Sequence, residues 1–204
     1  MTDRLTSQRR AGMTTRELAA LCESRINGLS RIRQAFEHSD APEHVEGLID
    51  DLRTTASDWD AAVSRSPDGD PVALRVGART VRDGVPGFGA VADALESYAS
   101  ALESGQARHG AGLAQLQAAR QRATGLTVAG GASAGAGAGA GVGADPERTE
   151  AASSAAIAVL DVACAGYAAC QDAYEAARDA EEALYAALSY VRVRPSGHRN
   201  DLRV

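Results

Sequence analysis

Apolar residues recur along most of this chain at intervals of three and four residues, which is the spacing of one face of an α-helix. The two longest series run from Val91 to Ala123 and from Ala156 to Val191. The one alternating segment, residues 191–194, is too short for a convincing strand and continues a helical series. The pattern therefore predicts an all-α fold whose helices pack through long apolar stripes.

The first helix is predicted to begin at Thr14, because Thr14 and Glu17 form a capping-box pattern. Residues 1–13 then form a leader that we expect to be disordered. The pair Asn27-Gly28 is expected either to bend this helix or to split it. Its apolar positions are Leu18, Cys22, Ile26, Leu29, Ile32 and Phe36.

Two further helices are predicted from an N-cap residue followed by a proline in the first turn. These signals are Asp40 with Pro42, and Asp70 with Pro71, and the second of these helices ends before Pro86. The stripe of the first is Val45, Ile49, Leu52, Ala56, Trp59 and Val63, and that of the second is Leu74, Ala78, Val81 and Val85.

The two long stripes predict long helices over residues 88–124 and 147–192. In the first of them Gly105, His109 and Gly112 take the place of large residues, so a neighbouring backbone can approach closely there. Its coiled-coil-like stripe is Val91, Leu95, Tyr98, Leu102, Gly105, His109, Gly112, Leu116, Ala119 and Ala123. The stripe of the second is Ala156, Leu160, Ala163, Tyr167, Cys170, Tyr174, Ala177, Leu184, Leu188 and Val191.

Residues 125–146 separate the long helices and are dominated by Ala and Gly. Such a segment buries too little surface to offset its ordering entropy, so it is predicted to be a flexible linker. It lets the 147–192 helix fold back antiparallel, with Tyr167 and Tyr174 facing the Gly-rich part of the other long helix. We therefore expect an elongated helical bundle built on a long antiparallel helical hairpin.

The predicted organisation has five parts. The leader is followed by a helical bundle region over residues 14–124 and then by the linker. The 147–192 helix after the linker packs back on the bundle. A basic tail occupies residues 193–204. Because aromatic residues make up only 4% of the chain, the helices are expected to be slim and closely packed.

Charge and hydropathy exclude several classes of partner. The net charge is −6 and the basic residues, all Arg, are interspersed along helices, so no nucleic-acid binding is expected. No apolar run reaches the roughly 18 residues of a membrane span. The polar start of the chain lacks the apolar region of a signal peptide, so we expect a cytoplasmic protein, with leaderless secretion as a possible route of export.

The sequence shows no pattern that carries catalysis. Adjacent Glu-His pairs at 37–38 and 43–44 point to different helix faces, and His109 is read as a semi-buried residue of its stripe rather than a metal ligand. The three cysteines match neither a disulfide framework nor a metal site: Cys22, Cys164 and Cys170. We therefore expect no catalytic residue, metal or cofactor, and an enzyme only through groups that the fold brings together.

Candidates for a partner interface are Trp59, Leu29, Ile32 and Phe36, from the two helices outside the hairpin. Trp59 is the only Trp of the chain, and Trp is enriched at interface hot spots. Its position on an apolar stripe equally suits a core anchor, so both interpretations stay open.

Two segments resemble the N-terminal helical modules of actinobacterial type VII secretion substrates, in the broad Trp-x-Gly superfamily. They are Gly69–Arg75 and Ala92–Glu103, and the similarity covers roughly residues 44–124, with a weaker match over 147–191. The resemblance implies helical hairpins that pair into four-helix bundles and leave through a dedicated exporter without a signal peptide. The Trp-x-Gly turn itself is absent, because Asp60 and Ala61 follow the Trp, and no Tyr-x-x-x-Asp/Glu export motif occurs.

The sequence thus favours a non-enzymatic helical interaction protein that works through a protein partner or self-association, in the manner of an oligomerising type VII substrate. The alternative is a cytoplasmic adaptor, scaffold or assembly subunit of a phage or bacterial operon, with no export. A helical-bundle enzyme or ligand binder is a third reading.

Overall fold

The computed structural model describes residues 13–39, 41–126 and 146–193 of the chain, and over these residues it contains helices and no strand. The prediction of an all-α fold is confirmed. The helices are α2 (Thr15–Glu37), α3 (Pro42–Ala56), α4 (Trp59–Ala62), α5 (Pro71–Gly84), α6 (Gly89–Gly125) and α7 (Pro146–Val193).

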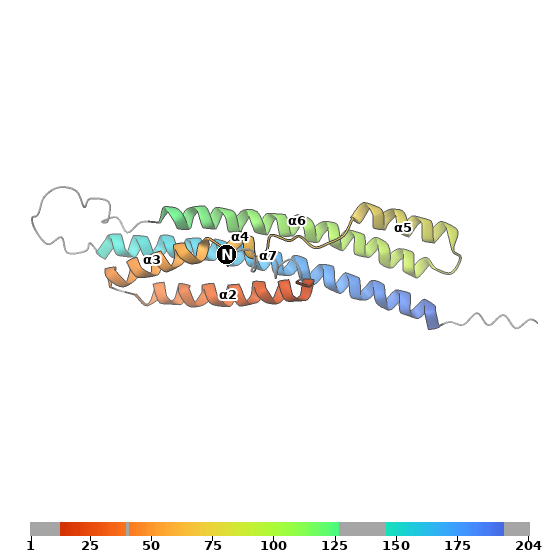
Figure 1. Cartoon of the computed structure of the whole chain (residues 1–204), viewed down its shortest axis with the longest axis horizontal. Helices are drawn as coiled ribbons and strands as arrows, with labels where there is room; N and C mark the ends of the chain where they lie inside the picture. Colours follow the sequence, from red (N-terminus) through yellow and green to blue (C-terminus); the bar gives the residue numbers. More distant parts are fainter. Residues whose placement is uncertain (1–12, 40, 127–145, 194–204) are drawn as a thin grey trace, which may run out of the picture.

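The molecule is built on the antiparallel hairpin of α6 and α7, which lie side by side along its long axis (Figure 1). Their lengths of 37 and 48 residues make the protein elongated, as the stripes predict. We call the end that holds the C-terminus of α6 and the N-terminus of α7 the proximal half, and the other end, with α5, the distal half.

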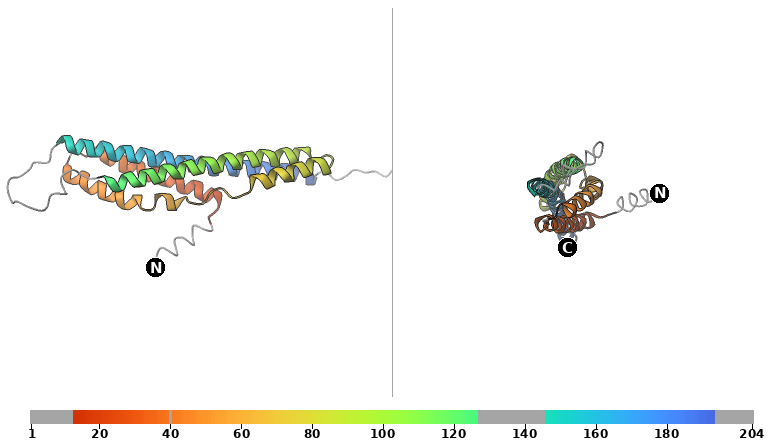
Figure 2. Two further views of the ribbon diagram at one scale, coloured as in Figure 1. Left: turned by 90° about the horizontal axis from the view of Figure 1, so that it is seen from above. Right: turned by 90° about the vertical axis from the view of Figure 1, so that its left-hand side faces the viewer.

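The two halves differ in how many helices cover the hairpin. In the proximal half α2 packs along α7, and α3 and α4 lie against the hairpin, so that four helical layers enclose a core (Figure 2). In the distal half α5 packs on α6, while α7 keeps α6 as its main neighbour. The core cluster accordingly lies in the proximal half and includes Leu29, Phe36, Ile49, Leu52, Trp59, Leu116, Leu160, Tyr167 and Tyr174.

The hairpin closes through small residues, as the Gly-rich part of the α6 stripe predicts. A Cβ atom added to Gly112 would lie 2.7 Å from the carbonyl oxygen of Gly166 and 2.8 Å from the sulfur of Cys170. At Gly105 it would lie 3.2 Å from the carbonyl oxygen of Ala173. The two backbones therefore approach closely where α6 lacks side chains.

The predicted starts of two helices are found in the structure. Thr14 caps α2 and its capping box with Glu17 is complete, and Asp70 caps α5 by accepting hydrogen bonds from two backbone N–H groups. Helix α2 runs unbroken through Asn27-Gly28. Helix α3 begins at Pro42 after Ala41, whereas Asp40 lies outside the described residues.

The stripe from Val45 to Val63 does not form one continuous helix, because the chain breaks at Ser57 and Asp58 between α3 and α4. Helix α4 itself ends after one turn. There the N–H of Val63 bonds to the carbonyl oxygen of Asp60, and the carbonyl oxygen of Trp59 accepts a hydrogen bond from the hydroxyl of Tyr167 at 3.0 Å. All six stripe residues are still buried.

The distal half departs from the predicted stripes in three places. In α6 the buried residues near its start are Val91, Ala92 and Ala99, so Val91 is buried as predicted. Leu95 and Tyr98 of the stripe are only half-buried. Of the α5 stripe only Ala78 is buried. Along α7 the stripe is buried from Ala156 to Ala177 and is exposed or half-buried beyond that point.

Several predictions fall on residues outside the described ranges. These are the disorder of the leader up to residue 12, the flexibility of the linker over 127–145, and the character of the tail from residue 194 on.

Candidate functional site

A buried polar group, His109 on α6, fastens the segment that follows α4 to the hairpin. Its Nε2 lies 2.7 Å from the carbonyl oxygen of Val63 and 3.0 Å from the hydroxyl of Tyr174. That hydroxyl donates in turn to the carbonyl oxygen of Arg65 at 2.6 Å. Burial lowers the pKa of His109, so the ring is neutral and acts as a structural donor. This matches the reading of His109 as a residue of its stripe.

The three cysteines carry no activated thiol. Burial raises the pKa of Cys22 to about 12 and that of Cys170 to about 11, and it also raises the pKa of Cys164. At neutral pH these thiols stay protonated, and a protonated thiol is a poor nucleophile. Within the described ranges, no group of three or more His, Cys, Asp or Glu side chains is placed to hold a metal ion.

The structure places the four predicted interface candidates inside the proximal half. Trp59, Leu29 and Phe36 belong to the core and Ile32 packs against it; the side chain of Trp59 is only 1% exposed. Trp59 therefore serves as a core anchor, the second of its two interpretations. Of the four side chains only that of Ile32 is partly exposed.

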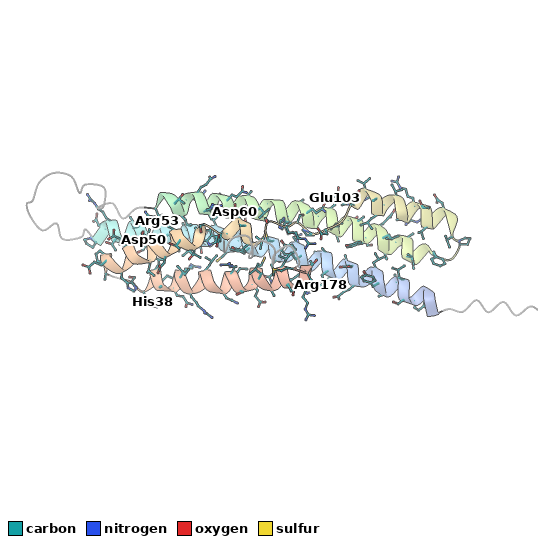
Figure 3. All side chains as sticks on the ribbon, in the orientation of Figure 1. His38, Asp50, Arg53, Asp60, Glu103 and Arg178 are labelled. Carbon is teal, nitrogen blue, oxygen red and sulfur yellow. The ribbon has the colours of Figure 1, made fainter. Side chains whose placement is uncertain are left out.

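The surface that stands open instead lies on α7 in the distal half. Helix α2 begins partway along α7, close to Arg178, and α7 continues beyond it (Figures 1 and 3). The exposed positions that follow share one broad side of the helix, and we call them the distal face: Glu182, Ala183, Tyr185, Ala186, Ser189 and Tyr190.

The distal face has an aromatic side chain on each side and a small residue at its centre. Tyr185 is 61% and Tyr190 is 73% exposed, and at 100° per residue they lie on either side of Ala186. Leu188, at its margin, is 40% exposed. Alanine between two large side chains lets another helix approach closely, as Gly112 and its neighbours do within the hairpin.

The charges around the distal face are mostly paired within the chain. Arg178 forms ion pairs with Asp179 at 2.7 Å and with Glu182 at 3.8 Å, and these contacts raise the pKa of the guanidinium. Burial raises the pKa of Tyr98 on α6, with a smaller contribution from the nearby charge of Glu181. The neighbouring helix α5 is fixed to α6 by ion pairs from Arg75 and Arg82.

Helix lengths are the sequence signal that could have revealed the distal face. Helix α2 has 23 residues against 48 in α7, or about 34 Å against 72 Å at 1.5 Å per residue. A helix that short cannot cover α7 along its whole length. The predicted interface candidates lie on α2 and α4, so the sequence pattern did not single out this end of α7.

Helix α7 is also the one helix in the described part of the chain that is long and apolar enough to cross a membrane, judged by length and composition alone. In this structure its apolar face packs against α2 and α6.

No family model matches this chain, and neither the curated proteins nor the solved structures contain a match.

Proposed function

We propose that this protein is a non-enzymatic helical interaction module that self-associates through the distal face of α7. The observation that carries the proposal is the exposure of Tyr185 and Tyr190 on the part of α7 that extends beyond the helix α2. Large apolar side chains gathered on one exposed helical face are typical of protein-protein interfaces.

The proposed occupant is the distal face of a second copy, running antiparallel. In the proximal half α2 supplies α7 with an antiparallel neighbour, and in the distal half the α7 of the second copy takes that place. Two hairpins then join as a four-helix bundle with an isologous, two-fold interface. The resemblance to type VII substrates, which pair as helical hairpins, supports the same arrangement.

The distal face is complementary to itself in this arrangement. With the two-fold axis at Ala186, Glu182 of each copy stands level with Tyr190 of the other, so each carboxylate can accept a hydrogen bond from a tyrosine hydroxyl. The two Glu182 residues are then about 12 Å apart along the axis, which exceeds the Debye length of about 8 Å at physiological salt. The short contact gives a reversible dimer.

Sedimentation equilibrium over a range of protein concentrations tests self-association. The mass is expected to rise from one chain towards two as concentration increases. The substitution Ala186→Glu places two like charges at the axis and should keep the protein monomeric, whereas Ala107→Glu, at an exposed position on the outside of α6, should leave the dimer intact. A monomer at all concentrations, or equal effects of the two variants, contradicts the proposal.

The cellular setting of this module is proposed to be export by a type VII secretion route without a signal peptide. The local resemblance of Gly69–Arg75 and Ala92–Glu103 supports this setting. Proteomics of the culture supernatant, with and without the exporter, tests it. Exporter-dependent release is expected; a strictly intracellular protein that still dimerises favours the cytoplasmic adaptor or assembly subunit.

A further inference from the structure

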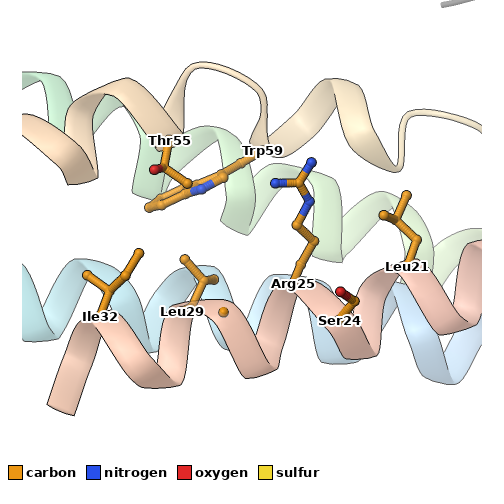
Figure 4. Close-up of a pocket in the computed structure, with 8 residues that line it drawn as sticks. Leu21, Ser24, Arg25, Leu29, Ile32, Thr55 and Trp59 are labelled. Carbon is orange, nitrogen blue, oxygen red and sulfur yellow. The ribbon is translucent and has the colours of Figure 1, made fainter. Parts of the chain in front are cut away.

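A half-open pocket lies between α2 and the α3–α4 segment of the proximal half (Figure 4). Its volume is about 340 Å³, at the lower end of the range for small-molecule sites. Three aliphatic side chains of α2 (Leu21, Leu29 and Ile32) form one wall, and the indole of Trp59 forms the opposite wall. Two facing walls of the pocket are therefore apolar, and the rest of the lining includes the polar side chains of Ser24, Arg25 and Thr55.

The pocket exists because α2 carries a glycine where a side chain would fill it. Gly28 lines the pocket, and a Cβ atom added there would meet nothing within 4 Å. Glycine inside a helix costs about 1 kcal/mol relative to alanine, and its φ here is an ordinary helical one that needs no glycine. The backbone gives no reason for this residue, whereas the open space beside it does.

One cation, Arg25, reaches into the pocket from α2 (Figure 4). Over the described residues, it has no ion pair or hydrogen bond with another side chain. The positive charge of Arg25 acts on the buried Tyr167: burial raises the pKa of the Tyr167 hydroxyl, and Arg25 opposes that rise. A half-buried guanidinium without a carboxylate is an open position for an anion.

Trp59, which lines the pocket, also carries a hydrogen-bond donor without a partner. The indole Nε1 of Trp59 is buried and has no partner among the described residues. Buried polar groups in folded proteins nearly always have a partner, and a bound acceptor is one way to supply it.

We propose that this pocket binds a small carboxylate with an apolar body, of the kind represented by medium-chain fatty acids. The carboxylate pairs with the guanidinium of Arg25, with the exposed hydroxyl of Ser24 at the rim as a second donor. The apolar body lies between the aliphatic wall of α2 and the indole of Trp59. This site is separate from the distal face and does not depend on self-association.

Fluorescence of Trp59 tests the proposal directly, because this residue is the only Trp of the chain and forms a wall of the pocket. Titration of the full chain with octanoate is expected to give a saturable change in the emission. Titration with 1-octanol, which has the same chain length and no charge, should give binding weaker by about tenfold, as expected for one charge-assisted contact. Equal binding of the two, or no saturable change with octanoate, overturns the proposal.

Two pairs of variants assign the binding to this pocket. Arg25→Gln should weaken octanoate by about tenfold without affecting 1-octanol, whereas Arg31→Gln, on the same helix, should change neither. Gly28→Leu fills the pocket and should abolish both titrations, whereas Gly47→Leu, at an equally open glycine of α3, should leave them intact. If circular dichroism shows that Gly28→Leu does not fold, the comparison of Arg25→Gln with Arg31→Gln alone assigns the binding to this pocket. Unchanged octanoate binding in Arg25→Gln overturns the proposal.

Discussion

At the scale of single residues, a few buried polar groups and glycines determine how the segments meet. His109 holds the stretch after α4 against α6. From α7, Tyr174 bonds to the same stretch and Tyr167 bonds to Trp59 of α4. The sequence placed His109 on its stripe, but it could not show that backbone carbonyls of Val63 and Trp59 are the acceptors. Those contacts join residues 46 and 108 positions apart, which no local pattern encodes.

The buried His109 should make stability depend on pH. Because burial lowers its pKa in the folded protein below the ordinary value of 6.5, the unfolded chain takes up this proton at a higher pH than the native protein does. Its contribution to stability is therefore complete above pH 6.5 and decreases as the pH falls below it. Urea midpoints at pH 7.5 and 5.5 should differ more in the native protein than in His109→Gln. An equal difference in both would contradict the neutral, buried ring.

Two glycines of α6 should respond in opposite ways to alanine. A Cβ at Gly112 would lie 2.7 Å from the carbonyl oxygen of Gly166, so Gly112→Ala must push the hairpin apart and should cost about 1–3 kcal/mol. A Cβ atom added to Gly110, on another face of α6, would meet nothing within 4 Å. Gly110→Ala should therefore stabilise the helix by about 0.5–1 kcal/mol. Chemical denaturation measures both. Destabilisation by Gly110→Ala, or tolerance of Gly112→Ala, would argue against the close approach.

At the scale of helices, starts were easier to predict than packing partners. The capping box of Thr14 and the Asp70-Pro71 start are local signals, and the structure contains both. The break at Ser57 and Asp58 was not predictable, because the apolar spacing from Ala56 to Trp59 and Val63 continues through it. The periodicity of α5 predicted more buried stripe residues than the structure has, because this helix packs mainly against one neighbour, α6.

Helix α5 should be the first of the described helices longer than one turn to open. Only Ala78 of this helix is buried, and exposed ion pairs of Arg75 and Arg82 contribute little in water. Hydrogen exchange should be faster over α5 than over the buried part of α6. Asp70→Ala removes its N-cap, at about 1 kcal/mol, and should speed exchange in α5 alone. Equal protection of the amides of α5 and of the centre of α6 against exchange would contradict the loose packing of α5.

At the scale of the whole molecule, the elongated hairpin was predictable because two long stripes flank a segment with no core-forming residues. How far each part of the stripe is buried was not, since burial depends on where α2 begins and on which side α5 packs. Tyr185 and Tyr190 lie beside the predicted stripe, which continues through Leu184 and Leu188, and the periodicity did not mark them as an exposed face. Only the spatial arrangement separates Tyr174, inside the core, from Tyr185, outside it.

The unequal burial of the hairpin makes its two halves respond differently to a buried charge. Leu160 is fully buried in the proximal core, so Leu160→Asp should cost about 4 kcal/mol or more and leave the chain largely unfolded. Leu95, in the distal half, is half-buried, and Leu95→Asp should cost clearly less. Circular dichroism and melting temperatures measure both. Unchanged melting of Leu160→Asp would mean that the stripes are wrongly assigned.

Site-specific cross-linking tests most directly the claim that the distal faces of two copies meet at Ala186. Cys164 is first replaced by Ala, since it is the least buried of the native cysteines, and one new thiol is then introduced by Ala186→Cys or, as a control, Ala107→Cys. Under mild oxidation Ala186→Cys should form a disulfide-linked dimer, and Ala107→Cys should stay monomeric. Failure of Ala186→Cys to cross-link faster than the control would contradict the antiparallel pairing of α7.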